Sequence, residues 1–272
     1  MWDIPLLLLA ELAVLGVFTG FMAGLLGIGG GMIMVPVLTW LFSSRGVDPG
    51  MSVKMAIATA MSTILFTSIS SLRAHHQRGA VRWPLVKSFA PGILVGGLVA
   101  GAGAFAAIKG QGLAAVFGAF TAFSASQMLA DRKPKPTRTL PGPAARVAVG
   151  GGLGFISGLV GAGGAFLSVP YMIWCNVPVR EAVGTSAALG FPIALANTVG
   201  YVIGGWNQPA ALPGAFGFLY LPALVIIATI SVLMAPMGAK VAHSINTSSL
   251  KKVFALVLFC LSAYMLYKAF GT

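Results

Sequence analysis

The sequence predicts an all-α integral membrane protein made of two inverted repeats, each with about five membrane segments and glycine-broken half-helices. Three observations lead there: an extreme hydropathy, a duplicated glycine motif, and one long polar stretch between the two copies. Of the 272 residues, 57% are apolar and 8% are charged, whereas an average soluble domain has roughly 25% charged residues. So few charges do not cover a soluble protein of this size, which indicates that lipid surrounds most of the surface.

Ten apolar stretches follow one another along the chain, and most approach the length that crosses a bilayer. They cover residues 4–27, 32–42, 52–72, 84–107, 112–130, 145–160, 165–175, 182–204, 216–237 and 250–269. Two of them have only 11 residues, about 16 Å of helix, which is too short to span. These are 32–42 and 165–175, and both follow a glycine cluster. We expect a half-helix to begin near Met32 and another near Phe166.

The two glycine clusters are copies of each other. Residues 20–36 read GFMAGLLGIGGGMIMVP and residues 154–170 read GFISGLVGAGGAFLSVP, with nine identities in seventeen positions. A weaker echo pairs AIATA at 56–60 with AVGTS at 182–186. The pattern indicates a tandem duplication. It predicts a first membrane repeat over 1–129, a linker rich in proline and basic residues over 130–145, and a second membrane repeat over 146–272.

The distribution of Lys and Arg predicts the topology. With the N-terminus outside and five segments per half, thirteen basic residues fall on the cytoplasmic side and four on the outside. The four outside are Arg45, Lys54, Lys109 and Lys268. This bias follows the positive-inside rule, so we expect both termini to be periplasmic and the linker to be cytoplasmic. The net charge of +12 is therefore a record of topology, and no nucleic-acid partner is expected.

Each glycine cluster is also the candidate substrate site. A helix that starts at mid-membrane presents unpaired N–H groups and the positive end of its dipole, which favours an anion. The expected residues are Gly29, Gly30, Gly31, Gly163 and Gly164. The alternative is that these glycines only permit tight helix crossing. For the glycines of the stretch 84–107 (Gly92, Gly96, Gly97 and Gly101) we prefer that alternative.

Hydroxyl and amide side chains near the clusters offer neutral donors to the same anion. In the first half these are Thr59, Ser62 and Thr63, and in the second half Thr185, Ser186 and Asn197. Neutral donors hold an oxyanion without trapping it, which transport requires. The competing interpretation is that such side chains bond back to their own helix carbonyls or simply pack. Thr59 and Thr185 are the preferred functional candidates, because they occupy equivalent places in the two repeats.

Acidic residues are nearly absent, with only five in the chain. Of these, Glu11 alone is expected to reach into hydrocarbon. Cation carriers and proton relays usually need buried carboxylates, so an anionic substrate is favoured. No catalytic, phosphate-loop or metal-ligand motif is visible, and we therefore expect no enzyme activity, no cofactor and no metal.

With these motifs in view, the chain resembles the TauE/SafE family, the sulfite exporter family. The resemblance rests on residues 20–36 and their copy, on ATAMST at 58–63, on GTSAA at 184–188, on AHHQRGAVRW at 74–83, and on the ending at 236–270. It implies a transporter, most simply an exporter, of sulfite, sulfoacetate or other organosulfonates across a bacterial inner membrane. Many relatives carry an acid before the Trp of the fourth motif, whereas Arg82 stands there in this chain.

Alternating access is expected to come from rocking one half against the other, around an anion held at the paired helix N-termini near the bilayer midplane. The expected partners are thus a small sulfur-containing anion and the lipid bilayer, and a homodimer is left open. Two alternative functions also stay open at this point. One is an anion channel, or a carrier of another small solute such as an amino acid. The other is a membrane sensor or scaffold without flux.

Overall fold

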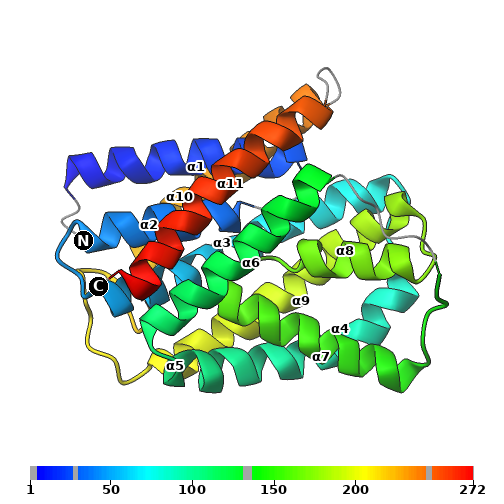
Figure 1. Ribbon diagram of the computed structural model, residues 1–272, viewed down its shortest axis with the longest axis horizontal. Helices are drawn as coiled ribbons and strands as arrows, with labels where there is room; N and C mark the ends of the chain where they lie inside the picture. Colours follow the sequence, from blue (N-terminus) through cyan, green and yellow to red (C-terminus); the bar gives the residue numbers. More distant parts are fainter. Residues whose placement is uncertain (1–4, 27–29, 131–136, 243–246, 272) are drawn as a thin grey trace.

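The computed structural model describes residues 5–26, 30–130, 137–242 and 247–271, which form a bundle of long helices with almost no sheet (Figure 1). The elements are α1 (Leu6–Leu26), α2 (Gly31–Ser43), α3 (Pro49–Gln77), α4 (Trp83–Leu98), the π-helix η1 (Val99–Ala104), α5 (Phe105–Ala107), α6 (Gly110–Ala130), α7 (Pro143–Val160), α8 (Ala165–Trp174), α9 (Val179–Gly205), β1 (Ala215–Phe216), β2 (Leu219–Tyr220), α10 (Leu221–Ala242) and α11 (Thr247–Phe270). The all-α membrane class is confirmed.

Within these ranges, eight helical segments are long and apolar enough to cross a bilayer, with α4, η1 and α5 forming one of them. The helices α2 and α8 have 13 and 10 residues and are too short to do so, as expected. The stretch 216–237 differs from the sequence expectation. It begins with the β1–β2 hairpin, and its helix starts only at Leu221. Gly217, with φ of +57°, makes a turn that a right-handed helix does not contain.

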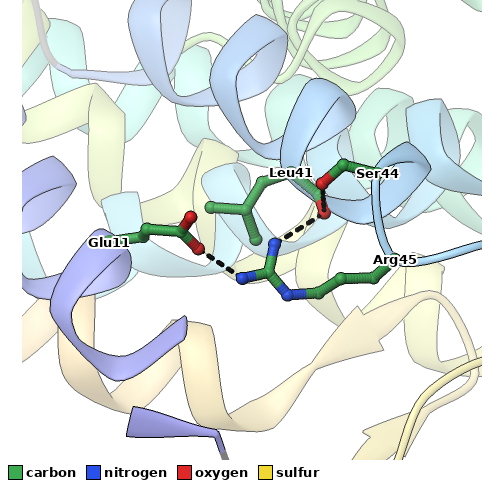
Figure 2. Close-up of polar contacts among 4 residues, drawn as sticks. All are labelled: Glu11, Leu41, Ser44 and Arg45. Atoms are coloured by element: carbon green, nitrogen blue, oxygen red, sulfur yellow. Dashed lines mark hydrogen bonds and ion pairs between the residues drawn. The ribbon is translucent and has the colours of Figure 1, made fainter. Parts of the chain in front are cut away.

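Both short helices return to the end of the molecule where the preceding helix begins. Arg45, just after α2, forms an ion pair with Glu11 near the start of α1 (Figure 2). In the second half, Trp174 at the end of α8 donates from Nε1 to Thr137 Oγ1 at 2.9 Å, in the segment that precedes α7. Figure 1 accordingly shows α2 and α8 extending in opposite directions from the middle of the molecule. Each short helix therefore forms a helical hairpin with the long helix before it, α2 with α1 and α8 with α7.

Glycines bring α1 close to α10, and α4 close to α7. A Cβ atom added at Gly24 would lie 1.9 Å from the Ala235 carbonyl oxygen, and one at Gly92 would lie 1.8 Å from the Val147 carbonyl oxygen. At Gly96, Gly97 and Gly101 an added Cβ would also approach α7 or α9 to within 3.0 Å. The expectation that the glycines of the stretch 84–107 permit tight helix crossing is therefore confirmed. Both close pairs join a helix of the first repeat to a helix of the second.

The directions of the paired helices follow from the same contacts. Successive glycines of α1 meet successive residues of α10, so these helices are parallel, as are α4 and α7. By contrast, α3 and α9 are antiparallel, because Ser62 contacts Thr198 whereas the later Ser68 faces the earlier Gly190. Two inverted repeats would give these directions. The inverted relation itself, and which face is cytoplasmic, stay predictions.

The antiparallel pair α3–α9 occupies the centre of the bundle, between α1–α10 on one side and α4–α7 on the other (Figure 1). Thirteen of the 29 residues of α3 are buried. This pair forms the wall against which both short helices pack.

Candidate functional site: the two glycine breaks

Both glycine clusters interrupt the helix, as the sequence predicts. The helix α7 ends at Val160, and Gly161 (φ +70°) caps it by donating its N–H to the Ser157 carbonyl at 2.8 Å. Gly164 (φ +77°) then starts α8. Only glycine adopts such left-handed conformations at little cost. In the first half, α1 ends at Leu26 and α2 begins at Gly31 after Gly30, while Gly29 lies outside the described residues. The half-helices begin within one residue of the expected Met32 and Phe166.

The two breaks meet inside the protein. A Cβ at Gly31 would lie 2.5 Å from the Gly161 carbonyl oxygen, so the start of α2 touches the end of α7. The side chain of Ile64, on α3, lies within 3.4 Å of the Cβ positions of both Gly31 and Gly163. The helix starts are therefore neighbours, with one aliphatic side chain between them; the start of α2 is buried and the start of α8 is partly exposed.

Thr59 and Thr185 have equivalent partners, but not in the glycine breaks. The Tyr220 backbone N–H donates to Thr59 Oγ1 at 3.0 Å, and the Arg82 backbone N–H donates to Thr185 Oγ1 at 3.0 Å. Tyr220 precedes α10 and Arg82 precedes α4, which are the third long helices of the two halves. Each threonine thus fixes the start of that segment in the opposite half. This structural role was not anticipated from the sequence.

The remaining first-half candidates, Ser62 and Thr63, donate hydrogen bonds to backbone carbonyls of their own helix, α3. Thr63 Oγ1 donates to the Thr59 carbonyl at 3.0 Å, and Ser62 Oγ donates to the Ala58 carbonyl at 2.8 Å. Ser62 also contacts Thr198 Oγ1 at 3.1 Å. For these two residues, the back-bonding considered as the alternative is what the structure contains.

The second-half candidates lie closer to a break. Ser186 contacts Ser168 of α8, with 2.7 Å between the two hydroxyl oxygens. Asn197 Nδ2 donates to the Gly154 carbonyl at 3.2 Å and to the Ile193 carbonyl at 2.8 Å, which ties α9 to α7. Ile193 in turn reaches the Cβ position of Gly164. The polar side chains of Ser186 and Asn197 therefore lie on α9 where it packs against the helices α8 and α7 that flank the break.

Ser157 is the residue near the breaks that sequence reasoning missed. It lies on α7, 2% exposed, and its Oγ is 3.3 Å from the Cβ position of Gly164. Its place inside the motif GFISGLVGAGG was visible, but nothing in the letters distinguishes a hydroxyl that packs from one that faces the break.

The acidic residues of the described ranges are all engaged. Glu11 pairs with Arg45, whose Nη1 also donates to the Leu41 carbonyl at 3.0 Å (Figure 2). Glu181 pairs with Arg82. Asp48 accepts a hydrogen bond from the Met51 N–H at 3.0 Å as the cap of α3. Over these ranges no group of His, Cys, Asp or Glu is arranged to hold a metal ion.

Comparison with known proteins also indicates a membrane transporter. The chain matches the family described as sulfite exporter TauE/SafE over residues 12–265. It is 30% identical to a probable membrane transporter protein of Haemophilus influenzae, covering 93% of this chain and 96% of that protein. It is 27% identical to one of Methanocaldococcus jannaschii (96% of each chain) and 25% identical to YunE of Bacillus subtilis (94% and 97%). No solved structure matches the chain. These relatives are named as membrane transporters and not as enzymes.

Proposed function

Because the chain belongs to the TauE/SafE sulfite exporter family, we propose that this multi-pass membrane transporter exports small sulfur-containing anions, such as sulfite, sulfoacetate or other organosulfonates, across the bacterial inner membrane. The observation that carries the proposal is the meeting of the two glycine breaks. Two helix starts lie together between the ends of a bundle whose long helices are apolar enough to span. A helix start at that depth favours a negative charge.

The state of the acids supports an anion over a cation. Every carboxylate in the described ranges is paired or caps a helix, which leaves none to neutralise a cation at the centre. The sulfur-containing class comes from the family description, since the helix starts themselves would accept other small oxyanions. The cytoplasmic face would be the one that carries the linker, as the Lys and Arg distribution predicts.

The helix pairing changes the mechanism expected from the sequence. A rocking of one sequence half against the other would break both close pairs, α1–α10 and α4–α7, since each pair joins the two halves. Glycine contacts of this kind hold helices together by extensive backbone packing. We therefore propose that the cross-half pairs are the moving units, and that each pivots against the central pair α3–α9.

Flux measurements in proteoliposomes test the function. We expect saturable uptake of radiolabelled sulfite, stimulated by unlabelled sulfite or methanesulfonate on the opposite side. Such counterflow requires a carrier. Single-channel currents without counterflow would instead show a pore, and the absence of both would contradict transport of this substrate class.

A pair of glycine variants then connects the flux to the break. In Gly164→Ala the added Cβ makes the left-handed conformation of this residue (φ +77°) costly, whereas an added Cβ at Gly152 of α7 meets nothing within 4 Å. The first substitution should lower sulfite flux at least about tenfold, while Gly152→Ala should transport as the unmodified protein does. Equal sulfite flux in the two variants would show that the conformation of the glycine break does not affect transport.

A further inference from the structure

The first turn of α8 has donors without acceptors. Among the described residues, none accepts a hydrogen bond from the backbone N–H of Ala165 or Phe166. Such groups are normally satisfied by a side-chain cap, by water or by a ligand. The residue at the cap position, Gly164, has no side chain to offer.

Ser157 adds a hydroxyl at the same place. Some buried hydroxyls in the other helices, such as those of Thr19, Thr39 and Ser62, donate to the carbonyl four residues earlier, whereas those of Ser43, Thr121 and Ser124 have no partner among the described residues and lie away from the breaks. Ser157 Oγ has no partner in the described part of the chain, although it is 2% exposed. It lies 3.3 Å from the Cβ position of Gly164, at the start of α8. A buried hydroxyl in this position is costly unless something accepts its hydrogen.

The first half has no counterpart to this arrangement. The duplication places Ala23 opposite Ser157 and Met34 opposite Ser168, while the 56–60 and 182–186 echo places Ala60 opposite Ser186. At these three positions the first half has apolar side chains. The hydroxyl beside the first break belongs to Thr19, whose Cβ lies 2.8 Å from the Cβ position of Gly30, and it already donates to the Leu15 carbonyl at 2.7 Å. The two hairpins therefore differ in chemistry at these positions.

Accessibility differs in the same direction. Residues 30–36 at the start of α2 are all buried, whereas Gly163, Ala165 and Phe166 at the start of α8 are partly accessible. The α2 start is also covered by the Gly161 carbonyl, whose oxygen lies 2.5 Å from the Cβ position of Gly31. Among the described residues of the two helix starts, only those at the start of α8 combine free donors, a buried unpartnered hydroxyl and partial exposure.

We propose that the anion is held by the second half alone, at the start of α8, and that Ser157 is the side chain that determines its specificity. The backbone N–H groups of Ala165 and Phe166 and the Ser157 hydroxyl together supply donors to different oxygens of one group. This favours sulfite and the sulfonate head, which carry several oxygens on one atom, over a monoatomic halide. The inference rests on the proposed function and narrows its two-sided site to one side.

Ligand binding to the purified full-length protein, measured by calorimetry with sulfite and with methanesulfonate, tests the inference. Ser157→Ala removes a hydrogen bond to a charged group, so both dissociation constants should rise about tenfold or more. Ser157→Thr keeps the hydroxyl and should retain most of the affinity. The matched control is Ser262→Ala, which removes another buried hydroxyl whose bond, to the Gly118 carbonyl at 2.7 Å, lies between α6 and α11. It should bind both anions as the unmodified protein does.

The outcomes separate the two proposals. If Ser157→Ala binds both anions with unchanged affinity while the unmodified protein still transports them, the one-sided site is wrong and the function stands. If the unmodified protein binds and transports neither anion, the proposed function fails and the inference fails with it. If Ser157→Ala does not fold, Ser157→Thr and Ala23→Ser test the inference instead. Loss of anion binding in Ser157→Thr together with stronger anion binding in Ala23→Ser would overturn the assignment of the site to the second half.

Discussion

Replacing Gly92 by alanine tests whether backbone contact between α4 and α7 holds the two repeats together. The added methyl group would lie 1.8 Å from the Val147 carbonyl oxygen and 2.8 Å from the Gly151 nitrogen. These are backbone atoms, so no side chain can move aside. Ordinary contacts begin near 3.4 Å, and the helices would have to separate by about 1.6 Å. Overpacking of this kind costs roughly 1–3 kcal/mol or more, which exceeds the helix-propensity gain of up to about 1 kcal/mol.

Thermal unfolding in detergent measures the effect, with Gly103→Ala as the matched control. A Cβ at Gly103, in the same membrane segment, meets nothing within 4 Å. For a chain of this size about 1 kcal/mol corresponds to roughly 2–4 °C, so Gly92→Ala should lower the melting temperature by several degrees while Gly103→Ala leaves it unchanged or raises it. Gly24→Ala makes the equivalent change in the pair α1–α10, because its Cβ would lie 1.9 Å from the Ala235 carbonyl oxygen. It should lower the melting temperature as Gly92→Ala does. A Gly92→Ala protein as stable as Gly103→Ala would refute the reasoning.

Further substitutions address other contacts. Thr59→Val and Thr185→Val each leave a backbone N–H without its acceptor, which should cost about 1–3 kcal/mol in denaturant unfolding; the two losses should add, because the sites are far apart and share no partner. Arg82→Glu should lower the free energy of unfolding by at most about 1 kcal/mol, since the ion pair between Arg82 and Glu181 is partly exposed. Combining Arg82→Glu with Glu181→Arg should restore the lost stability. A double variant less stable than the single variant would argue against the ion pair. Ile64→Ala should raise passive sulfite leak in proteoliposomes relative to Ile64→Val, because it empties the space between the two helix starts; equal leak would deny Ile64 a barrier role.

Much of the fold follows from the sequence because lipid imposes few solutions. A long apolar run in hydrocarbon has to be helical, and a glycine cluster followed by a short apolar run predicts a half-helix. The starts of α2 at Gly31 and α8 at Ala165 therefore agree with expectation to one residue. The segment before α10 was less predictable. Its apolar residues serve a two-stranded hairpin around Gly217, and hydropathy does not distinguish such a hairpin from a helix end.

The site was less predictable than the fold, for a physical reason. A threonine at the same place in both repeats has the same role in both, but the repeat does not say which role. Thr59 and Thr185 accept loop N–H groups, and those groups lie 161 and 103 residues away in the sequence. Conversely, Ser157 differs from its counterpart Ala23. Departures from the repeat, and not only its identities, indicate where the two halves differ in chemistry.

The cross-half contacts carry a last prediction, that neither repeat is a folding unit. In the first repeat, α1 packs mainly on α10 and α4 packs mainly on α7. The start of α4 is also held by the hydrogen bond from the Arg82 N–H to Thr185 Oγ1. A half expressed alone would expose the glycine faces of α1 and α4 and leave the Arg82 N–H without its acceptor. Co-expressed halves, split within the linker 130–145, should assemble into a complex that withstands detergent purification and transports sulfite, while each half alone should be degraded or aggregate. A first half that is monodisperse and thermally cooperative by itself would contradict the interlocked arrangement, and with it the view that the cross-half pairs are the units that move.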